Sequence, residues 1–184
     1  MDDEDTQLLI SSTKGNVELL AGHASSVEDI PAGAFPGAMA EKLGGILGCA
    51  RRPLLLSNAC ISGASAFVVA RRMILGGKCR VVIVGCDLLC EFISSGFASF
   101  KSLSPSPCRP YDAARDGLNL GEACAAVLMT SLRSELGENP VVMEGGFISD
   151  DANHISGPSR TGEELAIAIR KAMEESAVSA ERIG

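Results

Sequence analysis

Cys60 stands at the point where an apolar stretch passes into a helical pattern. Residues 53–57 read as a short strand that is apolar almost throughout, and residues 60–75 read as a helix that stops at Gly76 and Gly77. Such a junction projects the cysteine from the turn, and the partial positive charge of the helix N-terminus favours its thiolate. The pattern suggests a nucleophile, although a packed cysteine at a helix start is the more common reading of the geometry alone.

Groups for acid-base chemistry are scarce, because the chain has only two histidines, His23 and His154. A three-histidine metal site is therefore impossible within these 184 residues. The net charge of −7 argues against nucleic-acid binding, which needs a basic surface. No apolar run reaches the roughly 18 residues of a membrane span, and the acidic N-terminus resembles neither a secretory signal nor a transit peptide. We expect a cytoplasmic protein without a membrane span.

The seven cysteines form an odd number and include no C-x-x-C pair, so a disulfide framework is not expected. Six of them are predicted to be small core residues in a reducing cytoplasm, with Cys60 as the exception. Cys86 and Cys90 are four residues apart and could flank a zinc ion. Because a second pair or a nearby histidine is missing, this alternative is weak, and no metal site is predicted.

Strands alternate with helices along the chain, which predicts an α/β fold with largely parallel strands. The strand at 53–57 has the composition of an interior strand that is buried on both faces. A capping box at 161–164 opens an amphipathic helix. A polar loop at 104–121 is long enough to be functional or structurally braced. The other expected strands are 8–12, 80–86, 122–130 and 141–149, and the other expected helices are 39–47 and part of 88–100.

Four segments, in order along the chain, resemble the motifs of the β-ketoacyl-acyl-carrier-protein synthases of the thiolase-like superfamily. Residues 57–64, Ser-Asn-Ala-Cys-Ile-Ser-Gly-Ala, are similar to the active-site motif around the family's cysteine. Residues 104–112 and 115–123 are similar to its Leu-Ser, Arg-Pro-Phe-Asp, Arg-Asp-Gly-Phe and Gly-Glu-Gly-Ala series, and residues 151–156 to its Asp-Ala-Tyr-His segment. The departures are mild: Tyr111 replaces a Phe, Leu118 replaces an aromatic residue, and Ala123 replaces a glycine.

The resemblance implies a layered αβαβα fold and a decarboxylative Claisen condensation in fatty-acid or polyketide-type synthesis. Cys60 would hold the acyl group during this reaction. Phe97 would line the acyl pocket, Ser156 would contact the pantetheine arm, and Lys101 would meet the acidic acyl carrier protein. No cofactor is implied, since the substrate is carried on the phosphopantetheine of the carrier protein. A homodimer, or a heterodimer with a paralogous subunit, would pair through the strand at 53–57.

The family pattern also implies that the chain is partial. Residues 1–138 would form most of the N-terminal half of the duplicated fold, without its first strand. Residues 139–184 would form the first strand and helix of the C-terminal half. The two catalytic histidines and the lysine of the family would follow Gly184, so we expect acyl transfer to Cys60 but not condensation. His154 is expected to be structural and His23 to lie at the surface.

The long loop carries several charged residues, which could either brace the loop or transfer protons. Their pattern suggests an ion-pair network that braces the loop beneath Cys60, and a structural role is favoured over proton transfer. The residues of this expected network are Asp112, Arg115, Asp116 and Glu122.

Two other functions stay open. A non-catalytic partner subunit of the chain-length-factor kind fits the same resemblance, but such partners usually lack the active cysteine that Cys60 would represent. A cysteine hydrolase on an α/β fold would need a histidine within reach of Cys60, and neither His23 nor His154 is well placed to provide it.

Overall fold

The computed structural model describes residues 3–21, 26–152 and 160–183. A four-stranded sheet with the order β2-β1-β3-β4 forms its centre. β1 runs parallel to β2 and to β3, whereas β4 is antiparallel to β3. The predicted strands at 8–12, 53–57, 80–86 and 122–130 are confirmed to within two residues at each end. The four strands are β1 (Thr6–Ser11), β2 (Leu54–Leu56), β3 (Arg80–Asp87) and β4 (Ala123–Thr130).

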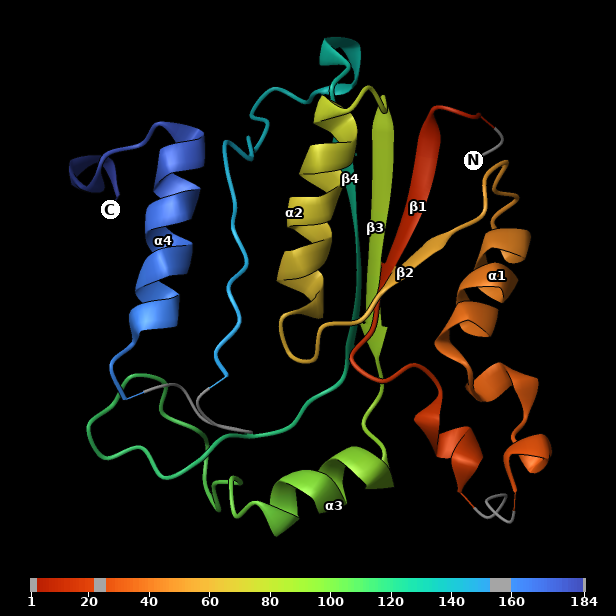
Figure 1. Cartoon of the computed structure of the whole chain (residues 1–184), viewed down its shortest axis with the longest axis vertical. Helices are drawn as coiled ribbons and strands as arrows, with labels where there is room; N and C mark the ends of the chain where they lie inside the picture. Colours follow the sequence, from red (N-terminus) through yellow and green to blue (C-terminus); the bar gives the residue numbers. More distant parts are fainter. Residues whose placement is uncertain (1–2, 22–25, 153–159, 184) are drawn as a thin grey trace.

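Two helices cover opposite faces of the sheet, α1 (Pro36–Ile46) on one face and α2 (Ser62–Leu75) on the other (Figure 1). Successive side chains of a strand point to opposite faces, so Leu9 packs into the cluster with α2, and Leu8 and Ile10 pack into the cluster with α1. All six residues of β1 are buried, which places this strand at the centre of both clusters. The expected α/β layering is confirmed.

Beyond α2, the extended segment 141–150 runs between α2 and α4 (Glu163–Ser176) (Figure 1). Two adjacent glycines permit the close approach on both sides. A Cβ atom on Gly146 would lie 2.9 Å from a methyl group of Val68 on α2, and one on Gly145 would lie 2.8 Å from the carbonyl oxygen of Ala172 on α4. At this point the space between α2 and α4 therefore admits the backbone of the segment but no side chain.

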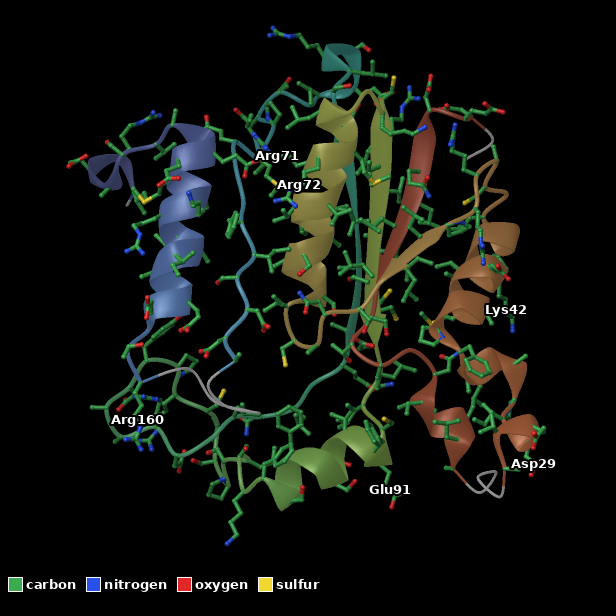
Figure 2. The ribbon with its side chains drawn as sticks, in the orientation of Figure 1. Asp29, Lys42, Arg71, Arg72, Glu91 and Arg160 are labelled. Atoms are coloured by element: carbon green, nitrogen blue, oxygen red, sulfur yellow. The ribbon has the colours of Figure 1, made fainter. Side chains whose placement is uncertain are left out.

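Arg71 ties these three elements together (Figure 2). Its guanidinium donates to the carbonyl oxygen of Met143 at 3.2 Å and to that of Glu144, and it forms an ion pair with Glu175 of α4. The Gly146 N–H donates to the Glu175 carboxylate at 3.0 Å. This hydrogen bond, together with the charge of Arg71, lowers the pKa of Glu175, so the carboxylate stays ionised and holds α4 against the segment.

α3 (Glu91–Ser99) and the long loop that follows it lie at the end of the sheet to which the parallel strands point their carboxyl ends (Figure 1). The loop at 104–121 contains no helix, as expected, and its only strand-like contact is an isolated bridge from Leu118 to Leu103.

Short 3-10 helices occupy parts of the remaining connections, at Val17–Leu20, Val27–Asp29, Ala32–Ala34, Arg133–Glu135 and Ala180–Arg182. None of the helices in the described ranges is both long enough and apolar enough to cross a membrane.

Several local expectations are wrong. The segment at 141–149 forms no strand, because no strand of the described chain lies beside it to complete a ladder. β2 is an edge strand and not an interior one, and its Leu54 is 44% exposed. The helix after the long polar segment begins at Glu163 with Gly162 as its N-cap, so Thr161 lies one position outside the cap and makes no capping box.

Candidate active site

The turn between β2 and α2 carries Cys60. α2 begins at Ser62, with Ile61 as its N-cap. Cys60 therefore precedes the helix by two residues, whereas the sequence predicted a helix that begins at residue 60. Ala59, just before the cysteine, has a positive φ of 45°. A left-handed conformation is unfavourable for a residue with a Cβ atom, and such strain is concentrated at functional turns. The turn exposes the Cys60 side chain, as the sequence predicts.

Ser62 holds this turn in place. Its hydroxyl donates to the carbonyl oxygen of Ala59 at 2.6 Å and accepts from the backbone N–H of Asn58 at 2.8 Å. The side chain of Asn58 in turn donates to the hydroxyl of Ser65 at 3.0 Å. Ser62 and Ser65 are both buried. The two residues that precede Cys60 are therefore fixed by hydrogen bonds to the first turn of α2, while Cys60 itself stays exposed.

A second set of hydrogen bonds joins the carboxyl ends of β1 and β3 below this turn. The Asp87 carboxylate accepts from the Ser12 hydroxyl at 2.7 Å and from the Thr13 N–H at 2.8 Å. The Ser12 hydroxyl also accepts from the Gly15 N–H at 2.9 Å, and the Ser12 carbonyl oxygen lies 3.4 Å from the Ser62 hydroxyl. Asp87 is thus connected through Ser12 to the residue that holds the Cys60 turn.

Removing this connection is expected to destabilise the protein. An Asp87→Ala chain loses two hydrogen bonds to a charged acceptor and leaves the Ser12 hydroxyl, which is 1% exposed, without its acceptor. We expect its free energy of unfolding to fall by about 2 kcal/mol. Urea unfolding followed by circular dichroism measures the change. Replacement of the exposed Glu138 by Ala is the control, and equal effects of the two substitutions would contradict the role given to Asp87.

A pocket of about 360 Å³ opens beside Cys60. The ends of β1 and β3, the first turn of α2 and the start of β4 form its walls, so the four elements of the site converge here. Its lining residues are Cys60, Ser11, Thr13, Ser62, Gly63, Gly121 and Ala123, with Gly85, Cys86 and Asp87 from β3 and Glu122 from the end of the long loop. Carboxyl ends of parallel strands meet at one edge of a sheet, and in open α/β sheets this edge holds the ligand.

The charged residues of the long loop bind mainly backbone groups. Asp116 lies 3.8 Å from Arg109 and accepts from the Ser104 hydroxyl at 2.8 Å. The side chain of Arg115 donates to the Asp112 carbonyl oxygen at 2.9 Å. The Glu122 carboxylate accepts from the Leu89 N–H at 3.0 Å. The loop is braced as expected, but the expected network of ion pairs among the four residues is wrong: three of them bind backbone groups, and Asp116 pairs with Arg109 instead.

Phe97 and Lys101, two other predicted site residues, do not line this pocket. Phe97 is half-buried on α3 and is not among the residues that line the pocket. Lys101 follows α3 with a positive φ of 55°, is exposed, and has no ion-pair partner among the described residues. Ser156, His154 and His23 lie outside the described residues.

The prediction of six core cysteines is wrong for all but Cys49, which packs against the buried cluster of Leu8, Ile10 and Ala40. Cys86 and Cys124 are exposed, and Cys49, Cys79, Cys90 and Cys108 are half-buried. Cys86 lies near the end of β3 and Cys124 near the start of β4, where the sheet borders the pocket instead of a helix. The described part of the chain contains no cluster of three His, Cys, Asp or Glu residues that could hold a metal ion.

Sequence reasoning also missed Asp87 and Ser12. The available signal was that Ser12 follows one expected parallel strand and Asp87 another, so that both belong to the same edge of the sheet. To predict the hydrogen bond between them, one must know that β1 and β3 are neighbours, and only the strand order of the folded sheet shows this.

Comparison with known proteins relates this sequence to one enzyme family. The family model for the N-terminal domain of β-ketoacyl synthases matches residues 6–135. The 3-oxoacyl-[acyl-carrier-protein] synthase 2 of Rhizobium meliloti is 32% identical over 135 residues, which cover 67% of this chain and 32% of that protein. The chloroplastic 3-oxoacyl-[acyl-carrier-protein] synthase I of Arabidopsis thaliana is 29% identical over 139 residues, which cover 70% of this chain and 29% of that protein.

Solved structures agree in fold. A β-ketoacyl synthase from Burkholderia phymatum superimposes with a TM-score of 0.81 at 24% identity, over 100% of this chain and 49% of that one. The ketosynthase ApeO in complex with its chain length factor ApeC, from Xenorhabdus doucetiae, gives a TM-score of 0.80 at 26% identity, over 98% of this chain and 47% of the matched chain. The chain thus spans between about a third and a half of the length of these relatives. It has the thiolase-like fold and belongs to the β-ketoacyl synthase family.

Proposed function

We propose that Cys60 accepts an acyl group from a thioester, as the first half-reaction of a 3-oxoacyl-acyl-carrier-protein synthase in fatty-acid or polyketide-type synthesis. One observation carries the proposal: the turn between β2 and α2 presents an exposed cysteine to a pocket, and hydrogen bonds of the Ser62 hydroxyl hold that turn. Curated relatives with matching sequence are named 3-oxoacyl-[acyl-carrier-protein] synthases.

The proposed acyl transfer runs through an ordinary thioester exchange. The Cys60 thiolate attacks the carbonyl carbon of the acyl thioester and forms a new carbon–sulfur bond. The tetrahedral intermediate carries a negative oxygen, for which the Cys60 backbone N–H is the candidate donor. The intermediate then collapses, the bond to the pantetheine sulfur breaks, and the departing thiolate takes up a proton. The product is an acyl-cysteine and a free pantetheine thiol.

The second half-reaction has different requirements. Loss of CO2 from a malonyl thioester gives an enolate whose oxygen needs positively polarised donors, and this enolate attacks the acyl-cysteine. Among the described residues that line the pocket, hydroxyl, thiol and carboxylate groups are present, but imidazole and ammonium groups are absent. This composition supports the proposal that the 184-residue chain is acylated without completing the condensation.

The proposed acyl donor is an acyl carrier protein, whose phosphopantetheine carries the substrate, so no bound cofactor is proposed. Lys101 is the proposed docking residue, because its exposed charge complements the acidic surface of a carrier protein. Phe97 and Ser156 remain the proposed contacts of the acyl chain and the pantetheine arm. A reducing cytoplasm is the proposed compartment.

We propose a two-subunit assembly that pairs through the open edge of β2. This strand is at one end of the sheet, and Leu54 is 44% exposed. An exposed apolar edge strand is a ready template for pairing with another chain. Similar structures include a ketosynthase in complex with its chain length factor and the ishigamide ketosynthase/chain length factor, which favours a heterodimer beside a homodimer. Within such a pair, Cys60 argues for the catalytic subunit and against a non-catalytic partner.

Mass spectrometry after incubation with an acyl-pantetheine thioester tests the proposed function. We expect one acyl group per chain, and we expect peptide mapping to locate it at Cys60. When malonyl-pantetheine is added next, the acyl-cysteine is expected to persist without release of a β-ketoacyl product. Acylation mainly at other cysteines would overturn the assignment of the nucleophile, and lack of acylation would favour a non-catalytic partner subunit.

A further inference from the structure

Cys86 and Cys124 lie directly opposite each other across the antiparallel pair formed by β3 and β4. The hydrogen bonds between the strands show whether these two residues form a hydrogen-bonded or a non-hydrogen-bonded pair. The Ser131 N–H donates to the Cys79 carbonyl oxygen at 3.1 Å, so these two opposed residues form a hydrogen-bonded pair. Hydrogen-bonded and non-hydrogen-bonded pairs alternate along an antiparallel ladder, and the register continues without a bulge from Arg80 to Asp87. Cys86 is seven residues beyond Cys79 and therefore belongs to a non-hydrogen-bonded pair.

This pair has the spacing that a disulfide needs. The Cα atoms of a non-hydrogen-bonded pair are about 4.5 Å apart, and its side chains are closer than those of the other type. Disulfides join cysteines whose Cα atoms are about 4.4–6.8 Å apart. The backbone can therefore accept a bond between the two sulfur atoms without moving the strands apart or changing their register.

Both thiols are open to a reagent, because both residues are exposed. Cys86 also lines the pocket that contains Cys60, so a small molecule in the pocket can reach Cys86. The neighbouring Cys124 thiol, followed by partial desolvation, raises the pKa of the Cys86 thiol. Because a raised pKa disfavours the Cys86 thiolate, we assign the first attack on an oxidant to Cys124.

We propose that Cys86 and Cys124 are a redox modification site, at which a hydroperoxide converts the two thiols into a reversible cross-strand disulfide beside the Cys60 pocket. The Cys124 thiolate attacks one oxygen of the hydroperoxide, the O–O bond breaks, and the leaving oxygen takes up a proton as alcohol or water. The resulting Cys124 sulfenic acid is attacked by the Cys86 sulfur, and water leaves with the Cys86 proton. Two thiols are oxidised and one hydroperoxide is reduced. An exposed disulfide of this kind is readily reversed by thiols, as in other redox-responsive cytosolic sites.

Free-thiol counting and peptide mapping test the site on the full chain. After brief treatment with hydrogen peroxide and alkylation of the remaining thiols, we expect the protein to lose two of its seven free thiols and to recover them with dithiothreitol. Trypsin cuts on both sides of the two cysteines, so the disulfide is expected to join peptide 81–101 to peptide 116–133. Retention of all seven thiols, or a bond that involves Cys60 or joins two chains, would overturn the proposal.

Peptide 81–101 also contains Cys90, so three serine variants separate the possibilities. Cys86→Ser and Cys124→Ser are each expected to abolish the linked peptide, whereas Cys90→Ser is the matched control and is expected to retain it in full. Far-UV circular dichroism verifies that each variant is folded, and the peptide map of the unmodified chain stands independently of them. A linked peptide that disappears in Cys90→Ser would assign the bond to Cys90 and contradict the register argument.

Discussion

A Cys60→Ser chain is expected to lose its acylation by an acyl-pantetheine thioester, with a fall in rate on the order of 100-fold or more. The physical reason is the difference between the two nucleophiles. A cysteine is partly ionised near neutral pH and its thiolate is highly reactive, whereas a serine hydroxyl needs an adjacent base to remove its proton. The described residues that line the pocket offer the carboxylates of Asp87 and Glu122, and both are engaged by hydrogen bonds from Ser12, Thr13 and Leu89.

Intact-mass spectrometry over a time course measures this rate. Cys86→Ser is the matched control, since Cys86 lines the same pocket but lies on a strand and not at the β2–α2 turn. We expect the control to be acylated at nearly the rate of the unmodified chain. If Cys60→Ser is acylated as fast as the control, the covalent chemistry of this protein does not depend on the turn that carries Cys60.

A Gly117→Ala chain is expected to lose about 2–4 kcal/mol of its free energy of unfolding. Gly117 has a φ of 152°, a conformation that a residue with a Cβ atom rarely adopts. A Cβ atom there would lie 2.6 Å from the Ser104 backbone nitrogen and 2.8 Å from the Ser102 carbonyl oxygen, and backbone atoms cannot rotate out of the way. The collision falls where the loop ends are joined, because the Leu118 N–H donates to the Ser102 carbonyl oxygen at 2.9 Å.

Urea unfolding measures this loss, and Gly121→Ala is the matched control. Gly121 belongs to the same loop, has no positive φ, and has open space around its Cα atom, so we expect the control to change stability by less than about 0.5 kcal/mol. Since Gly121, Glu122 and Ala123 line the Cys60 pocket, the shift of the loop in Gly117→Ala is also expected to slow acylation of Cys60. Equal stability of the two variants would mean that the loop tolerates a side chain at position 117.

Local patterns predicted the elements that surround the site, because these elements are determined by residues close in sequence. The apolar run at 80–86 and the helix that stops at Gly76 were recognisable without any knowledge of their neighbours. The segment at 141–149 has an apolar composition that suggests a strand, but a strand also requires a partner, and its neighbours are the helices α2 and α4. The error at β2 has the same origin, since apolar composition does not reveal which side of a strand is paired.

By itself, the sequence determined the α/β class, the resemblance to the β-ketoacyl synthases and the choice of Cys60, since each depends on a contiguous motif. Only the tertiary structure decided which residues support and surround that cysteine. The bond between Ser12 and Asp87 joins residues 75 positions apart, and the pairing of Cys86 with Cys124 depends on the register of β3 and β4. A shift of one residue in that register would move every side chain of β4 to the other face of the sheet, so no local pattern can specify these contacts.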